Sequence, residues 1–478
     1  MNIYVYGFKS SYEQEHITRI FFPGAGITGG KAGKDKSCAV FWLGKNKAAC
    51  AVRNNGRCAA AIIKNDAETE KAAAEKLCLE AYRMFCGFTG MRPAWGALTG
   101  VRPVRLIRDM RAAGKTESEI EERFLKHFDV SENKFRLCVQ TANAQEKAVG
   151  EYNKHDCSIY ISIPFCPSRC SYCSFVSKTI EKCENEVQPY TDKLCAEIAA
   201  VGDIVKRNSL NVKTVYIGGG TPTALSARQL ESVMTAVADS VDLSSAEEYT
   251  VEAGRPDCTT PEKLEIIKKL GATRLSINPQ TLNDEVLKNI GRRHTAKDII
   301  ACYNAARAAG HNNINMDLIA GLPGDTVQSF RNSVKGVTEL RPENITVHTL
   351  TLKRASILVI DKLCCEYGNV AEMLKSEELL TDNGYYPYYL YRQKGTLQNL
   401  ENTGFTRPGF EGLYNIYIME EIHTILSAGA GGVTKLKAPG ITERIFNFKY
   451  PHEYISGFED IIKRKERINE FYGSYLDT

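Results

Sequence analysis

The sequence predicts an α/β fold centred on a parallel sheet that helices cover. Six apolar, β-branched runs alternate with helical stretches through the middle of the chain, and the runs are nearly continuous in their apolar character. Parallel strands buried on both faces have this pattern, and helical crossovers connect them. Glycines and polar residues gather where several runs end. We therefore expect a sheet closed or partly closed as a barrel, with an α+β region before it and a small domain after it.

The expected strands and helices follow one another in regular order. The strands are expected at about 158–163, 213–217, 248–253, 273–277, 313–319 and 344–350. Helices are expected at about 186–207, 226–240, 260–269 and 295–309. Active sites of such barrels lie at the carboxyl ends of the strands, so the residues that end or follow each strand are the first candidates for function.

Three domains are expected from the length of 478 residues, with boundaries near 150 and 360. The first, 1–150, contains short alternating strands, a helix near 67–87 and two more helices at about 116–127 and 131–151. The barrel occupies 151–360. The last, 361–478, contains a helix over 369–381 and an aromatic run, Tyr385–Tyr391, that is typical of an edge strand, although it could also wall a flat aromatic ligand.

Composition excludes some classes of protein. A formal charge of +4 on a chain of this size gives no support for a nucleic-acid partner. There is no 18-residue apolar run and no apolar core of a signal peptide, so we expect no membrane segment and a cytoplasmic protein. Sixteen cysteines in so long a chain suit a reducing compartment rather than a disulfide framework.

Three of those cysteines, Cys166, Cys170 and Cys173, form the motif C-x3-C-x2-C. Random placement of 16 cysteines would produce one such spacing only about 0.02 times. Three thiolates from one loop can hold three irons of a cubane cluster and leave the fourth iron open to a small molecule. The alternatives are a zinc site, which would want a fourth Cys or His close by, and simple buried thiols; the next cysteine, Cys183, lies ten residues on.

The loop as a whole, Tyr160-x3-Pro-Phe165-Cys166-x3-Cys170-x-Tyr172-Cys173, resembles the cluster loop of radical S-adenosylmethionine (SAM) enzymes, in particular the oxygen-independent coproporphyrinogen III dehydrogenase family. The resemblance implies a partial (β/α)6 barrel and a 4Fe-4S cluster bound by Cys166, Cys170 and Cys173. It implies that SAM chelates the open iron and is cleaved to methionine and a 5′-deoxyadenosyl radical. Tyr160, Phe165 and Tyr172 are then expected at the cofactors.

Four further segments match the family in the same order along the chain. Taken singly, a glycine triplet is usually a turn and a charged residue is usually a surface ion-pair partner. Together they imply a SAM site made of Gly218, Gly219, Gly220, Thr221, Glu252, Gln280, Arg292 and Asp317. Tyr160 and Gln280 are expected to act in catalysis as well as in cofactor binding.

The segment from Trp95 to Arg105, Trp-Gly-Ala-Leu-Thr-Gly-Val-Arg-Pro-Val-Arg, resembles a branch of the family often called HemZ. Trp95, Arg102 and Arg105 would form either a substrate rim or a packed turn with solvated arginines. Lys353 and Arg354, just after the sixth strand, are candidate partners for substrate carboxylates.

The resemblance implies oxygen-independent oxidative decarboxylation of coproporphyrinogen III to protoporphyrinogen IX in heme biosynthesis, with an electron donor such as flavodoxin or ferredoxin. Phe175 stands where established dehydrogenases carry a fourth cysteine, and Ser162 where many members carry histidine. Two alternatives stay open. One is a heme-binding chaperone, although Tyr414–Met419 lacks that family's heme-binding pattern. The other is a radical SAM methyltransferase or heme-opening enzyme.

Overall fold

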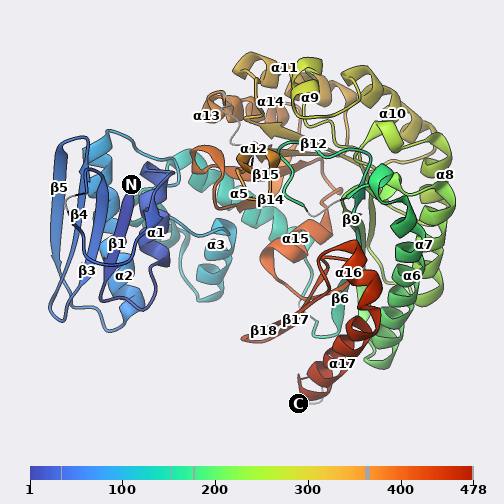
Figure 1. Cartoon of the computed structure of the whole chain (residues 1–478), viewed down its shortest axis with the longest axis horizontal. Coiled ribbons are helices and arrows are strands. Elements are labelled where there is room, and N and C mark those ends of the chain that lie inside the picture. Colours follow the sequence, from blue (N-terminus) through green and yellow to red (C-terminus); the bar gives the residue numbers. More distant parts are fainter. Residues whose placement is uncertain (34, 152, 176–177, 361–366, 476–478) are drawn as a thin grey trace. The chain divides into compact units, whose positions relative to one another are not determined.

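The computed structural model describes residues 1–478 apart from 34, 152, 176–177, 361–366 and 476–478. The described residues form two compact units (Figure 1). The first unit contains Met1–Val139 and Tyr391–Glu401, and the second contains Gln140–Leu390 and Asn402–Thr478. The domain boundaries expected at 150 and 360 stay predictions.

The second unit is built on one eleven-stranded sheet whose centre is parallel. Six neighbouring strands follow one another in sequence order, and each is parallel to the next. They are β6 (Asp156–Ile163), β9 (Asn211–Gly219), β10 (Glu248–Glu252), β11 (Arg274–Ser276), β12 (Ile314–Ala320) and β13 (Asn344–Thr349). All six expected strands are present, and the predicted α/β fold class is confirmed.

The residues after 360 extend this sheet at both ends. Beside β6 lies β16 (Thr424–Ala428), which is parallel to it, followed by the antiparallel strands β17 (Val433–Ala438) and β18 (Ile441–Phe446). At the other end β15 (Glu401–Thr406) is antiparallel to β13, and β14 (Tyr386–Arg392) is the last strand. The aromatic run is therefore an edge strand of the described sheet, which agrees with one of its two predicted interpretations.

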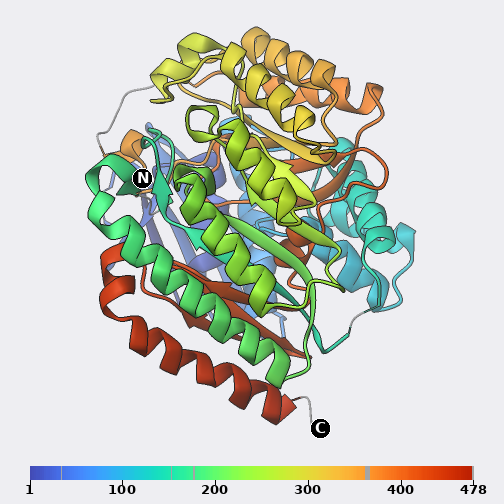
Figure 2. The same ribbon diagram turned by 90° about the vertical axis from the view of Figure 1, so that its right-hand side faces the viewer.

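Helices line the outside of the parallel strands in an arc (Figures 1 and 2). Their starts follow from the sequence: Ser226 and Gln229 form a capping box at the start of one helix, and Thr295 and Asp298 form another. Each helix turns an apolar stripe to the sheet. The crossover helices are α6 (Glu184–Arg207), α7 (Ala227–Ser240), α8 (Pro261–Lys269), α9 (Asp284–Asn289), α10 (Ala296–Ala308) and α11 (Val327–Leu340).

Shorter elements complete the second unit. The helix expected over 369–381 is divided into α13 (Val370–Leu374) and α14 (Glu378–Asp382), which a tight turn separates. Two short strands, β7 (Phe165–Cys166) and β8 (Lys178–Thr179), pair in parallel beside the cysteine loop. The remaining helices are α12 (Ile357–Ile360), α15 (Leu413–Glu420), α16 (Pro451–Ser456) and α17 (Phe458–Tyr475).

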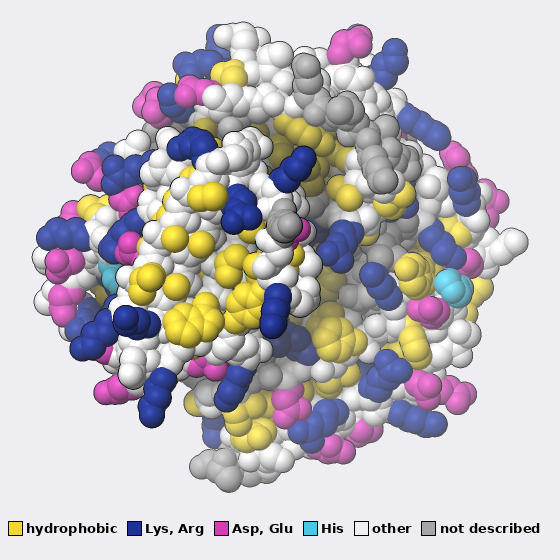
Figure 3. All heavy atoms as spheres, turned by 60° about the vertical axis from the view of Figure 1, so that its left-hand side comes forward, with side chains coloured by type: hydrophobic (Ala, Val, Ile, Leu, Met, Phe, Trp, Pro, Cys, Tyr) yellow, Lys and Arg dark blue, Asp and Glu magenta, His cyan; other side chains and the backbone are white. Residues whose placement is uncertain are grey.

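The first unit has a five-stranded sheet in the order β2-β1-β3-β4-β5. Its strands are β1 (Asn2–Tyr6), β2 (Gly26–Ile27), β3 (Cys38–Leu43), β4 (Lys47–Asn54) and β5 (Arg57–Lys64). One face packs on α1 (Tyr12–Phe21) and α2 (Glu70–Thr89) through Phe21, Phe41 and Phe85. The other face leaves Trp42 and Ile62 exposed, and Figure 3 shows this side of the molecule, where hydrophobic side chains lie among Lys and Arg.

After α2 come α3 (Pro103–Ala112), α4 (Glu117–Glu122) and α5 (Glu132–Ala148). Trp95, before α3, is only 1% exposed; its indole N–H donates to Glu401 at 2.7 Å, and the Arg392 guanidinium lies over its ring. Trp95 is thus part of a packed turn rather than a rim. Among the residues that the structure describes, no helix is both long and apolar enough to cross a bilayer.

Candidate functional site

The carboxyl ends of the parallel strands bring the predicted site residues to one edge of the sheet. Ile163 at the end of β6 pairs with Gly219 at the end of β9, and Glu252 ends β10 opposite Ser276 of β11. Asp317 lies on β12, next to the Gln280–Leu318 bridge. Because all these strands point the same way, residues as far apart in the sequence as Ile163 and Asp317 meet at this edge.

The cysteine loop leaves β6 and is held by backbone contacts. Ser171 N–H donates to Ile290 O at 3.0 Å, and Cys173 N–H donates to Cys170 O at 3.2 Å. Cys170 is buried, while Cys166 and Cys173 are partly exposed. Burial raises the pKa of the Cys173 thiol to about 11, so this sulfur carries a proton at neutral pH unless a metal replaces it.

The glycine segment packs directly against this loop. Gly219 has a φ of +112°, which favours glycine, and a Cβ on Gly220 would lie 2.6 Å from Phe165 O and 3.0 Å from Cys166 Sγ. Thr221 N–H donates to Phe165 O at 2.8 Å, and its hydroxyl lies 3.5 Å from Cys166 Sγ. A side chain on Gly220 would collide with the cysteine loop, so glycine allows the two segments to approach this closely.

Glu252 is a partly buried carboxylate of the site. Its Oε1 accepts a hydrogen bond from the Tyr216 hydroxyl at 2.6 Å. Burial raises the pKa of Glu252 to about 7, and the nearby Asp317 carboxylate adds to this shift. The side chain therefore changes charge near neutral pH, which is unusual for a carboxyl group and common in functional sites.

Gln280 and Asp317 are linked through their backbones. Gln280 N–H donates to Asp317 O at 2.8 Å, and Gln280 has the left-handed φ of +68°. Its side-chain Oε1 is buried without a hydrogen-bond partner among the described residues, as expected for an acceptor that awaits a ligand. The Asp317 carboxylate accepts from Asn315 at 2.8 Å and lies 3.7 Å from the ring of His348.

Arg292 connects the cysteine loop to the strand ends. Its guanidinium donates to Asn278 O at 2.7 Å, to Gly254 O at 3.2 Å and to the Tyr172 hydroxyl at 3.3 Å. Its Nε is buried with no partner among the described residues. Tyr172, between two of the cysteines, is thus in contact with the arginine.

Aromatic rings line the interior beside Glu252. Tyr160 of β6 and Tyr216 of β9 stack at 6.2 Å between ring centroids, and Tyr414 of α15 lies 4.5 Å from Tyr216. Phe165, expected at the cofactors, instead has its ring in the core against Tyr190 at 5.2 Å, and only its carbonyl faces the glycine segment. Tyr414 belongs to Tyr414–Met419, the segment in which we expect no heme-binding pattern of the chaperone type.

Sequence reasoning did not single out several residues of this site. They are Tyr216, Asn278, His348 and Arg255 with Asp257, all on or just after the same parallel strands. The run Ala253-Gly-Arg-Pro-Asp257 follows directly on Glu252, so the rule that function lies after barrel strands would have found it.

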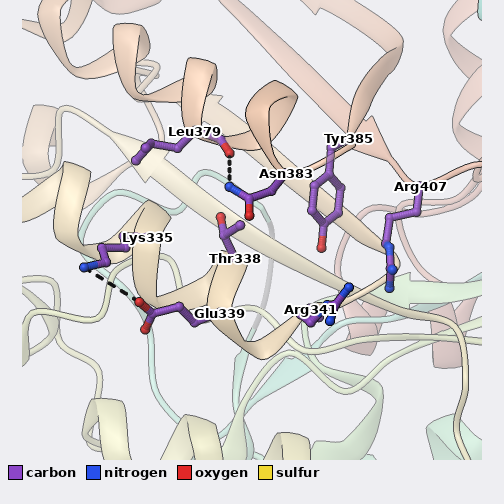
Figure 4. A pocket seen from close by; sticks show the side chains of 8 residues that line it. All are labelled: Lys335, Thr338, Glu339, Arg341, Leu379, Asn383, Tyr385 and Arg407. Atoms are coloured by element: carbon purple, nitrogen blue, oxygen red, sulfur yellow. Dashed lines mark hydrogen bonds and ion pairs between the residues drawn. The ribbon is translucent and has the colours of Figure 1, made fainter.

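A separate cavity of about 480 Å³ lies elsewhere in the second unit, between α11 and α14 (Figure 4). Arg341 just after α11 and Arg407 just after β15 point toward one another at one side of it, with Tyr385 beside them. None of the predicted site residues lines it, so it is distinct from the strand ends described here.

Comparison with known proteins agrees with this geometry. Residues 160–336 match the family model described as Radical SAM superfamily. A protein of Bacillus subtilis (strain 168) named oxygen-independent coproporphyrinogen-III oxidase-like protein HemZ is 39% identical over 79% of this chain and 77% of its own length. The heme chaperone HemW of Lactococcus lactis is 31% identical over 66% of this chain and 79% of its own.

Among solved structures, coproporphyrinogen III oxidase (HemN) from Escherichia coli superposes with a TM-score of 0.51 at 23% identity, over 67% of this chain and 72% of that one. At this identity the likeness concerns the fold. The barrel and its loop define a protein of the radical SAM class. Within that class, the chain belongs to the coproporphyrinogen-III oxidase-like family that includes HemZ.

The cofactors of the class are a 4Fe-4S cluster and SAM, as predicted, and the residues present fit them. The described residues contain no group of three or more His, Cys, Asp or Glu that could hold a single metal ion. Cysteines that each bind a different iron of a cubane need not converge on one point. The close approach of the glycine segment to Cys166, the unpartnered Gln280 oxygen and the three cysteines of one loop fit such a cluster and a polar ligand.

Proposed function

We propose that this protein is a radical SAM oxidoreductase that converts two propionates of coproporphyrinogen III to vinyl groups without oxygen. Cys166, Cys170 and Cys173 would hold the cluster, and Gly218–Thr221, Glu252, Gln280, Arg292 and Asp317 would hold SAM. When bound, the two cofactors supply a radical that removes a hydrogen atom from the substrate. Loss of CO₂ and of one electron to an acceptor would then leave each vinyl group.

One observation supports a substrate rich in carboxylates. The segment with Lys353 and Arg354 is hydrogen-bonded to the cysteine loop: Arg169 donates to Ala355 O at 2.7 Å, and Leu358 N–H donates to Ser171 O at 3.1 Å. Lys353 and Arg354 are exposed beside this contact. Two cations at the rim of a cluster site suit the propionates of a tetrapyrrole.

The cluster-reconstituted full chain can be tested anaerobically with SAM, a reductant and coproporphyrinogen III. We expect product that has lost two CO₂, with matching 5′-deoxyadenosine. 5′-Deoxyadenosine without decarboxylation would overturn the substrate and point to another radical reaction. Stoichiometric heme binding without SAM cleavage would favour the chaperone function, which is considered because HemW proteins are also relatives.

The affinity for SAM is expected to weaken as the pH falls through about 7. The pKa of Glu252 is about 7, so its carboxyl group becomes protonated below that pH and loses the charge that favours a cationic, hydrogen-donating ligand. If SAM requires the ionised form, Kd rises about tenfold for each pH unit below the pKa. Anaerobic equilibrium dialysis with labelled SAM between pH 5.5 and 8 measures this.

Glu252→Gln should bind SAM more weakly and with a flat pH profile. Glu247→Gln is the matched control, because this neighbouring glutamate is partly exposed and pairs with Lys213. It should keep the native profile. A native protein whose Kd does not change across this pH range would contradict a role for Glu252 charge in SAM binding.

A further inference from the structure

We propose that Arg255 sets the reduction potential of the cluster through a charge-assisted hydrogen bond to the sulfur of Cys170. This inference rests on the proposed binding of a cluster by the three cysteines, but not on the identity of the substrate. Arg255 would be a positioning residue that acts through a cluster ligand rather than a group that touches the reacting atoms.

The contact is direct and buried. Arg255 is 3% exposed, and its Nη1 lies 3.6 Å from Cys170 Sγ, within the range of an N–H···S hydrogen bond. The same guanidinium donates to the Ser168 hydroxyl at 2.9 Å and to Ser168 O at 3.5 Å. It therefore contacts the cysteine loop at two residues, Ser168 and Cys170.

Asp257 fixes the orientation of this guanidinium. Its two carboxylate oxygens accept from Arg255 Nε at 2.9 Å and from Nη2 at 2.6 Å, a bidentate pair. Burial alone would raise the pKa of Asp257, but hydrogen bonds from His294 and Arg255 hold it well below its ordinary value. The positive end of the pair, the Arg255 guanidinium, is buried against the sulfur, whereas the carboxylate of Asp257 is partly exposed.

This arrangement favours the reduced cluster. Reduction adds one electron from an external reductant to the cluster, and hydrogen bonds to cluster sulfurs are one of the factors that set its potential. A positive charge in a buried site stabilises the added negative charge more than it would in water. Arg292 is a second cation near Cys170: it donates to Asn278 O, Gly254 O and the Tyr172 hydroxyl, and it also interacts with Cys170, so the two arginines both place positive charge at this sulfur.

Because Arg255 and Asp257 carry opposite charges, removing one or the other should shift the reduction potential of the cluster in opposite directions. A purely structural role of the pair would not produce this pattern. The full chain, reconstituted with iron and sulfide, is titrated with a reductant and followed by electron paramagnetic resonance, without SAM or substrate. We expect Arg255→Gln to shift the midpoint potential downward. Arg255→Lys keeps the positive charge but loses the bidentate geometry of the guanidinium, so it should shift the potential less. Asp257→Asn removes the negative end and is expected to shift the potential upward.

Arg293→Gln is the matched control, since Arg293 is exposed and its guanidinium pairs with Glu181 at the surface. The midpoint potential of the cluster in Arg293→Gln should equal that in the native chain. Native potentials in both Arg255 variants at full iron content would overturn the proposal, and so would a shift in the same direction for Arg255→Gln and Asp257→Asn. If Arg255→Gln loses iron, Arg255→Lys and Asp257→Asn still decide the matter.

The outcomes also separate this inference from the function on which it rests. A native chain that takes up no cluster would refute the cysteine site itself. If the native chain takes up the cluster and the variants at Arg255 and Asp257 have the native midpoint potential, only the role of Arg255 in setting the potential is refuted. Neither measurement depends on activity toward coproporphyrinogen III.

Discussion

Replacing Cys170 with alanine is expected to abolish both the cluster and SAM cleavage. The three proposed ligands come from one loop, and two thiolates cannot hold a cubane that three were needed to hold. Changes in the partners of metal ligands alone cost 10 to 100-fold, so loss of a ligand should lower 5′-deoxyadenosine formation by more than about 100-fold. Iron and sulfide analysis with the anaerobic cleavage assay measures both effects.

Cys302→Ala is the matched control. Cys302 is also buried, but it lies on α10, outside the loop, where it fills space in the helical layer. It should retain native iron content with only a packing loss of about 1 kcal/mol. A Cys170→Ala protein with a full complement of iron would show that the loop is not the cluster site.

Glu197→Ala is expected to destabilise the second unit by about 3–5 kcal/mol, because it leaves a buried cation without its partner. Glu197 is fully buried on α6 and lies 2.8 Å from Lys465 Nζ of α17. It also accepts from Gly429 N–H at 2.7 Å, from the Tyr454 hydroxyl at 2.6 Å and from the Asn447 amide at 2.7 Å. Urea denaturation of the full chain, followed by circular dichroism, measures the loss.

The double variant Glu197→Leu with Lys465→Met is the control. It removes both charges at once, and replacing a buried ion pair by apolar side chains costs much less than breaking it. We expect its unfolding midpoint to lie well above that of Glu197→Ala. If Glu197→Ala unfolds like the native chain, the network does not hold α6 and α17 to the sheet.

The cysteine loop and the central strands were predictable because their signals are local. The spacing of Cys166, Cys170 and Cys173 is a property of eight consecutive residues. Strands such as β9 and β12 are indicated by nearly continuous apolar runs in the sequence. Parallel order then requires that Gly219, Glu252 and Asp317 meet at one edge, since strand ends of the same sense lie together. This much of the site follows from the sequence.

What only the tertiary structure decided is where distant segments pair. The part of the chain after 360 supplies β16, which pairs with β6. Ser162 donates to Ala430 O at 2.8 Å, just beyond the end of β16. The ring of Phe165 lies in the core, and Arg255 reaches Cys170 across 85 residues. No local pattern specifies such contacts, because they depend on which faces remain to be buried once the strands and helices have formed.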